Sequence, residues 1–136
     1  MIALDSSVVV GLIKGEPDLA PLLDALAREP VALGAPTVVE IRAWCARRLP
    51  SGRSALLDEL IAGADAVVSP FTAAMADAAS RAFALYGRGS GHPAKLNFGD
   101  ALVYGHARTL GLPLLFKGGD FHHTDVAVDP RSVVLR

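Results

Sequence analysis

Short apolar runs alternate with helix-forming segments along this chain of 136 residues. Four of the runs have the length and composition of buried strands, and they span Met1–Leu4, Val31–Leu33, Ala66–Val68 and Leu112–Phe116. A chain that alternates strands with helices in this way builds a parallel sheet and covers its faces with the intervening helices. We therefore expect an α/β fold with a mostly parallel central sheet flanked by helices.

Capping residues, glycines and prolines divide the remaining sequence into helices. The clearest amphipathic stripe places leucines at i, i+3, i+4 and i+7 in the segment 17–30, which predicts one helix there. The same signals predict five further helices, which are Ser6 or Ser7 to Ile13, Pro36–Leu49, a helix carrying Leu56–Ile61, Thr72–Tyr86 and Asn97–Leu110. No repeat, linker or low-complexity tract separates these segments, so we expect a single domain over residues 1–136.

The charge balance excludes a general attraction to nucleic acid or to an anionic membrane. The net charge is −1, so a nucleic-acid substrate needs a local site or a bridging cation. The single cysteine, Cys45, excludes an internal disulfide and a cysteine-rich zinc site, which fits a reducing compartment. The start of the chain, MIALDSSVVV, has an acid where a signal peptide carries basic residues, and no apolar run is long enough to span a bilayer. We therefore expect a soluble cytoplasmic protein without a membrane partner.

Four acidic residues fall where the expected strands and helices meet. Asp5 directly follows the first strand, and Asp120 follows the last one within the sequence KGGDF. Glu40 and Asp100 lie in the first turns of two expected helices. Ligands of parallel α/β sheets bind outside the carboxyl ends of the strands, so the four carboxylates can converge on one edge. Like charges so close together stay ionised only when a cation compensates them. Hard oxygen ligands without histidine or thiol suit Mg²⁺ or Mn²⁺.

Each of these acids also has a purely structural interpretation. The segment Thr37–Glu40 matches a capping box, in which the glutamate satisfies a backbone N–H. The segment Asn97–Asp100 places an acid at the third helical position, where it is favourable against the helix dipole. Asp5 fits a turn or a helix N-cap, and Asp120 fits a glycine-rich turn. The structural and functional interpretations are compatible, because helix N-termini are also places where a site meets anions.

The order of these acids, together with the residues around them, resembles the PIN-domain ribonucleases. More narrowly, it is similar to the VapC-type toxins of bacterial toxin–antitoxin pairs. The similarity lies in IALDSS, TVVE, LNFGDAL and LLFKGGDF, and it extends from MIALDSS to FHHTD. The resemblance implies a PIN-like three-layer fold, an acidic Mg²⁺ or Mn²⁺ site, RNA cleavage, a homodimer and inhibition by a cognate antitoxin protein of the VapB type.

Asp5, Glu40 and Asp100 coincide with the three acidic positions of this family, and Ser6 replaces its usual threonine. The resemblance implies that Asp5 and Asp100 hold a metal ion at the scissile phosphate, where the ion lowers the pKa of a bound water for in-line attack. Glu40 and a fourth acid then orient that water or hold a second metal. Because water attacks instead of the ribose 2′-hydroxyl, the products carry 3′-hydroxyl and 5′-phosphate ends.

The fourth acid departs from the family pattern. Many relatives carry an acid at the position of Gly118, and some carry one at the position of Gly119. Asp120 or Asp125 must therefore supply the fourth carboxylate, and we favour Asp120 as the catalytic residue.

Two other functions match parts of this pattern. A phospho-acceptor signalling domain also combines acids at a sheet edge with a lysine after a late strand, as Lys117 is here. That domain needs an acceptor aspartate directly after a middle strand, however, and none follows Val31–Leu33. A catalytically silent PIN-fold binding module keeps the fold without the activity. The three matched acids argue against it, and a metal-binding measurement separates it from an enzyme.

The polar segment GRGSGHPAK only superficially resembles a phosphate-binding loop. Its glycines follow a helix, whereas the glycines of dinucleotide and phosphate loops join a strand to a helix. We interpret the segment as a surface loop in which Arg88, His92 and Lys95 are candidates for contacts with an RNA backbone.

Overall fold

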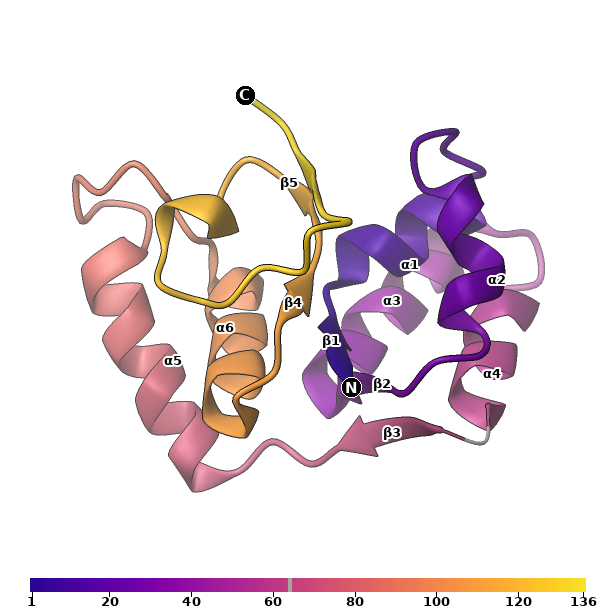
Figure 1. Cartoon of the computed structure of the whole chain (residues 1–136), viewed down its shortest axis with the longest axis horizontal. Coiled ribbons are helices and arrows are strands. Elements are labelled where there is room, and N and C mark those ends of the chain that lie inside the picture. Colours follow the sequence, from indigo (N-terminus) through magenta and orange to yellow (C-terminus); the bar gives the residue numbers. More distant parts are fainter. Residues whose placement is uncertain (64) are drawn as a thin grey trace.

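The computed structural model describes residues 1–63 and 65–136, and its centre is a four-stranded sheet (Figure 1). The strands are β1 (Ile2–Leu4), β2 (Val31–Gly34), β3 (Ala66–Ser69) and β4 (Leu114–Leu115). They lie in the order β3-β2-β1-β4, and every neighbouring pair is parallel. Ala3 of β1 lies opposite Ala32 on one side and opposite Leu114 on the other. The expected parallel sheet is confirmed, and β1 ends in the middle of its carboxyl edge.

Helices cover both faces of this sheet. They are α1 (Ser6–Ile13), α2 (Leu23–Leu26), α3 (Ala35–Arg48), α4 (Ala55–Ala62), α5 (Ala73–Tyr86) and α6 (Phe98–Leu110), with short 3₁₀ turns η1 (Ala20–Leu22) and η2 (Phe121–His123). In Figure 1, α5 and α6 lie on one side and α1 to α4 on the other. Alternating residues of β1 face these two layers: Ile2 and Leu4 join a core with α1, α3 and α4, and Ala3 joins a core with α5 and α6. The expected three-layer arrangement is thus confirmed, and none of the described helices is long and apolar enough to cross a bilayer.

The expected helix over residues 17–30 is wrong. The segment forms only the 3₁₀ turn η1 and the single α-helical turn α2. Pro21 lacks the N–H that a helix starting at the beginning of this segment needs, and its ring clashes with the carbonyl four residues earlier. The leucine stripe still contributes to the core at its two ends, because Leu19 and Leu26 are buried while Leu23 is exposed.

The C-terminal region also differs from the prediction. Only two residues of the expected strand Leu112–Phe116 pair within the sheet, as β4. The side chain of Ser132 bonds to the backbone of this segment in place of a further strand. Its Oγ accepts the N–H of Phe116 at 3.1 Å and donates to the carbonyl of Leu114 at 3.2 Å. The chain then forms a separate parallel pair of two-residue strands, β5 (Lys117–Gly118) and β6 (Val133–Val134). Strands this short show no periodicity in the sequence.

His106 of α6 is a buried polar residue in this architecture. Its side chain is 2% exposed, and within the described part of the chain its Nε2 has no hydrogen-bond partner. The ring packs against Gly34 at the end of β2, where an added Cβ would lie 3.3 Å from His106 Cγ. Burial lowers the pKa of His106 below its ordinary value, because the charged imidazolium would lose its hydration.

We expect this histidine to make folding sensitive to acid. The unfolded chain binds a proton at His106 below about pH 6.5, whereas the folded chain resists it, so the free energy of unfolding falls as the pH drops. His106→Leu removes both this proton linkage and the unpaired nitrogen, and the variant should therefore gain stability relative to the wild type on going from pH 8 to pH 5. Urea unfolding at both pH values measures this difference, with the exposed His123→Leu as control. Parallel pH dependence in the wild type and His106→Leu would contradict it.

Candidate active site

Asp5 lies directly after β1, at the middle of the carboxyl edge. It is the N-cap of α1, and its Oδ2 accepts the backbone N–H of Ser7 at 3.1 Å and also the Ser7 hydroxyl. The N-cap interpretation of Asp5 is thus confirmed, whereas Ser6 and Ser7, which we also considered as the start of this helix, lie inside its first turn. Asp5 is only 6% exposed. Burial raises the pKa of Asp5, while the hydrogen bonds from Ser7 oppose this rise.

Glu40 reaches from α3 toward the starts of two other helices. Its Oε1 accepts the hydroxyl of Ser6, in the first turn of α1. It also lies against α6, since a Cβ added to Gly99 would be 2.6 Å from Glu40 Oε2. The capping-box interpretation of Thr37–Glu40 is wrong, because α3 has Gly34 as its N-cap and no side chain caps it. Glu40 therefore has no role in starting its own helix.

Asp100 lies in the first turn of α6 and forms a reciprocal capping box with Asn97. The Oδ1 of Asn97 accepts the backbone N–H of Asp100 at 2.8 Å, and the Oδ2 of Asp100 accepts the backbone N–H of Asn97 at 3.0 Å. The structural interpretation of this motif is thus confirmed. It uses one oxygen of the carboxylate, and in the described structure the other oxygen accepts no hydrogen bond. The capping role leaves that oxygen available to a ligand.

The electrostatics of Asp100 connect it with the other three predicted acids. Burial raises the pKa of Asp100 to about 7, the backbone N–H of Asn97 opposes the rise, and the charges of Asp5, Asp120 and Glu40 add to it. All three acids are therefore close enough to influence one ionisation. A carboxyl group with this pKa gives up its proton at neutral pH when a cation approaches.

Asp120 and Asp125, the two candidates for the fourth acid, lie in different surroundings. Asp120 is the residue before η2, and its charge acts on Asp100. Asp125 instead accepts the Tyr104 hydroxyl at 2.5 Å and pairs with Arg108 at 3.5 Å. The charge of Asp120 therefore acts on the acidic edge, whereas Asp125 lies in a separate network with Tyr104 and Arg108.

The chemistry of this donor set fits a hard divalent cation. Every candidate donor is a carboxylate oxygen. The negative charges of the neighbouring acids that act on Asp100 favour a cation there. Across the described residues, no three His, Cys, Asp or Glu side chains lie close enough to hold one ion together. Mg²⁺ is commonly bound by one or two carboxylates and keeps several waters, so a site for this ion does not need three protein ligands.

Two adjacent serines orient these acids: Ser6 was noted in the sequence only as a replacement for threonine, and Ser7 was not identified as a site residue. Ser6 binds Glu40, whereas Ser7 binds Asp5, so each hydroxyl orients a different carboxylate. The Ser7 hydroxyl also accepts the backbone N–H of Lys117 at 3.0 Å, which connects the site to β5. The signal that could have indicated them is the pair of hydroxyls directly after an acid at a strand end.

Lys117 contributes its backbone to the site but not its charge. Its ammonium group pairs with Glu16 and lies 2.9 Å from Asp18 Oδ2. These two acids hold the pKa of Lys117 above its ordinary value. A phospho-acceptor domain needs this ammonium group at the acidic site, so the pairing argues against the signalling function.

Comparisons with known proteins identify the family of this chain. The family model of the PIN domain matches residues 2–127. Ribonuclease VapC28 of Mycobacterium tuberculosis is 45% identical over 135 residues, which cover 94% of this chain and 98% of that protein.

Two solved structures share the fold at low sequence identity. FitAcB from Neisseria gonorrhoeae has a TM-score of 0.70 and 23% identity, covering 96% of this chain and 98% of that one. VapBC2 from Rickettsia felis, bound to a DNA fragment from its promoter, has a TM-score of 0.67 and 17% identity, with coverages of 99% and 98%. Both structures confirm the three-layer α/β architecture.

Proposed function

This chain belongs to the PIN-domain family, and within it to the VapC ribonucleases; from this membership we propose that it is a metal-dependent endoribonuclease and the toxin of a toxin–antitoxin pair. The observation that carries the proposal is the meeting of acids at one edge of the sheet. Glu40 contacts the first turns of both α1 and α6, and Asp100, in the first turn of α6, keeps one carboxylate oxygen free of hydrogen bonds. Carboxylates gathered in this way repel one another, and a bound cation relieves that repulsion without protonating them. In this family such a cation promotes the hydrolysis of RNA by water.

Each acid has a defined task in this proposal. Asp5 and Asp100 would hold the ion, since Ser7 leaves one oxygen of Asp5 free and the capping box leaves one oxygen of Asp100 free. A bound Mg²⁺ or Mn²⁺ supplies Lewis-acid chemistry, since it neutralises charge at the scissile phosphate and makes water more acidic. Glu40, oriented by Ser6, and Asp120 accept hydrogen bonds from the attacking water and align it with the phosphorus.

We propose a cognate antitoxin of the VapB type as the protein partner, a homodimer as the working form and the cytoplasm as the location. The structure of VapBC2, which shares this fold, supports an antitoxin partner. The identity of 45% with ribonuclease VapC28 supports RNA as the substrate. Co-expression with the antitoxin should give a complex in which RNA cleavage is suppressed.

Cleavage of single-stranded RNA by the purified protein tests this function. We expect cleavage with Mg²⁺ or Mn²⁺, its loss on addition of EDTA, and its return when excess metal is restored. The products should carry 5′-phosphate and 3′-hydroxyl ends, because water is the nucleophile. Metal-independent cleavage that leaves a 2′,3′-cyclic phosphate would contradict the mechanism. Metal binding without any cleavage would favour the silent binding module.

The close approach of Gly99 to Glu40 gives a more local test. A methyl group at Gly99 would lie 2.6 Å from Glu40 Oε2, so Gly99→Ala should displace this carboxylate. The glutamate side chain can move, so the melting temperature should change little while kcat falls by about tenfold or more. Gly118→Ala is the matched control, because an added Cβ there meets nothing within 4 Å. Equal kcat values for the two variants would remove Glu40 from the site.

A further inference from the structure

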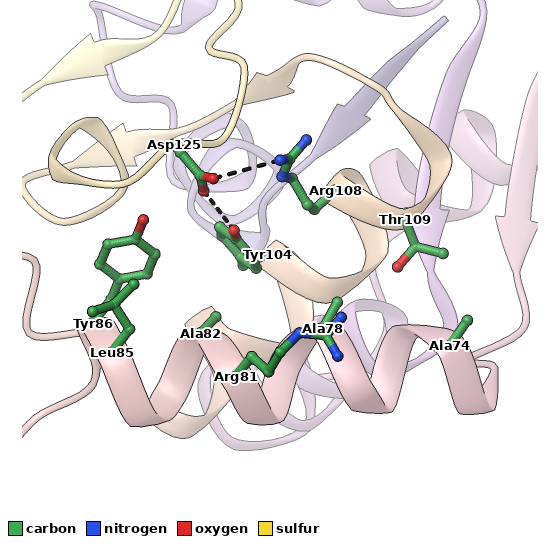
Figure 2. A pocket seen from close by; sticks show the side chains of 10 residues that line it. All are labelled: Ala74, Ala78, Arg81, Ala82, Leu85, Tyr86, Tyr104, Arg108, Thr109 and Asp125. Carbon is green, nitrogen blue, oxygen red and sulfur yellow. Dashed lines mark hydrogen bonds and ion pairs between the residues drawn. The ribbon is translucent and has the colours of Figure 1, made fainter.

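A pocket of about 500 Å³ lies between α5, α6 and the segment that carries Asp125 (Figure 2). Its floor is made of small residues of α5, including Ala78 and Ala82, which leave room above the helix. Figure 2 shows Tyr86, Tyr104, Arg81 and Arg108 among the side chains that line it. None of these residues is one of the four acids of the candidate active site, so the pocket is a separate feature of the surface.

The lining of this pocket carries a net positive charge, in contrast to the chain as a whole. It contains the guanidinium groups of Arg81 and Arg108 and one carboxylate, Asp125. Asp125 is shared, because it accepts the Tyr104 hydroxyl at 2.5 Å and pairs with Arg108 at 3.5 Å. Among the residues that the structure describes, Arg81 is in no ion pair. On a chain of net charge −1, the pocket offers the local basic site that a nucleic acid requires.

Aromatic side chains stand beside these charges. The ring of Tyr86 lies 6.0 Å from that of Tyr104 and 4.8 Å from that of His92, measured between ring centroids. His92 belongs to the loop after α5, which also exposes Arg88 and Lys95. Proteins bind single-stranded RNA with this combination, in which bases stack on aromatic rings and basic side chains contact phosphates.

The pocket and the acidic site share one helix, α6. Asp100, Tyr104 and Arg108 follow one another at intervals of four residues on α6. With a rise of about 1.5 Å per residue, Tyr104 is about 6 Å and Arg108 about 12 Å further along the axis than Asp100. A strand whose scissile phosphate lies at Asp100 can therefore reach the pocket within a few nucleotides.

We propose that this pocket binds a nucleotide of the single-stranded RNA substrate next to the bond that is cut, with its base on Tyr86 and the backbone phosphates at Arg81 and Arg108. The proposal rests on the proposed function, since it concerns the substrate of the same site. It extends that function by assigning RNA affinity to residues that do no chemistry.

Binding measured without metal tests the pocket separately from catalysis. A fluorescent single-stranded RNA of about ten nucleotides is titrated in EDTA at low salt, followed by anisotropy. Arg81→Ala should weaken binding by about threefold to tenfold and lower the slope of log K against log salt by about 1. Tyr86→Ala should weaken it by about fivefold or more, and Tyr86→Phe, which keeps the ring, should bind as the wild type does. Arg47→Ala, at an exposed arginine of α3, is the control for loss of one charge.

Cleavage assays with metal complete the test. Arg81→Ala and Tyr86→Ala should raise KM while kcat stays near the wild-type value, because neither residue touches the reacting atoms. Wild-type RNA affinity and KM in both variants would overturn the pocket proposal and leave the proposed function intact. Unchanged RNA affinity with loss of antitoxin binding or of the dimer would also overturn it, and would assign the pocket to a protein partner. A wild-type protein that cuts no RNA with metal would instead count against the proposed function.

Discussion

Asp100→Asn is expected to abolish RNA cleavage and, at the same time, to stabilise the metal-free protein above pH 7. The loss of cleavage follows from the loss of a charged ligand, since an amide is a poor substitute for a carboxylate around Mg²⁺. Removal of a group that only supports a metal ligand lowers metal affinity or activity by up to about a hundredfold. Loss of the ligand itself should therefore lower the cleavage rate by more than about a hundredfold. The asparagine can still accept the N–H of Asn97, which keeps the helix cap.

The gain in stability follows from the pKa of Asp100. Burial, with the charges of Asp5, Asp120 and Glu40, raises the pKa of Asp100 from 3.8 to about 7 in the folded chain. Between these values the folded chain binds more protons than the unfolded chain, so the free energy of unfolding decreases as the pH rises. Above pH 7 the wild type carries the full cost of this buried charge, and Asp100→Asn does not. We expect the free energy of unfolding of Asp100→Asn to exceed that of the wild type by about 2 kcal/mol at pH 8. Each unit of difference between the folded and unfolded pKa corresponds to about 1.4 kcal/mol, and the partial exposure of Asp100 to solvent reduces the sum.

Thermal melts at pH 5 and pH 8, with and without Mg²⁺, measure this effect beside a cleavage assay. The gain should shrink toward pH 5, where the wild-type carboxyl group is protonated as well. Asp77→Asn, at an exposed aspartate of α5, is the control that should change neither quantity. A destabilised Asp100→Asn protein that still cuts RNA would make Asp100 a helix cap and nothing more.

Gly105→Val is expected to cause the largest loss of stability among the substitutions considered, because Gly105 of α6 packs directly against the backbone of α5. An added Cβ would lie 2.5 Å from the carbonyl oxygen of Met75 and 3.0 Å from Ala79 Cβ. Backbone atoms of a helix cannot move aside as a flexible side chain can, so the two helices must separate. We expect a loss of about 3 kcal/mol, which corresponds to a melting temperature lower by roughly 10 °C.

The matched control is Ala46→Val, which introduces the same side chain at an exposed position of α3. It should lower the stability by less than about 0.7 kcal/mol, the propensity difference between alanine and valine in a helix. Similar melting temperatures for the two variants would show that α5 and α6 are not packed at Gly105 as described.

The sheet and most helices could be predicted from the sequence because their signals are local. Each strand is a compact apolar run, and the capping residues Ser54, Thr72 and Asn97 stand directly before the helices that they cap. The helix over 17–30 was the main failure, because the regular spacing of its leucines hid the effect of Pro21. The strands β5 and β6 contain two residues each, which is too short for any pattern to appear.

The candidate site could be predicted only as a set of acids at strand and helix ends. Which side chains meet depends on packing between elements that are far apart in sequence. Ser6 contacts Glu40 across 34 positions, and the hydroxyl of Ser7 meets the backbone of Lys117 across 110. For the same reason the sequence left Asp120 and Asp125 as alternatives, and only the folded chain shows that Asp125 pairs with Tyr104 and Arg108.

Titration of Mg²⁺ or Mn²⁺ into the purified protein, followed by calorimetry, tests most directly whether the acidic edge is a metal centre. The wild type should bind the ion, and Asp5→Asn and Asp100→Asn should each weaken binding by more than about tenfold. Asp120→Asn should have a smaller effect, and Asp125→Asn should bind as the wild type does, because Asp125 belongs to the separate network with Tyr104 and Arg108. Equal metal affinity in the wild type, Asp5→Asn and Asp100→Asn, or no binding by any of them, would contradict a metal centre at this edge.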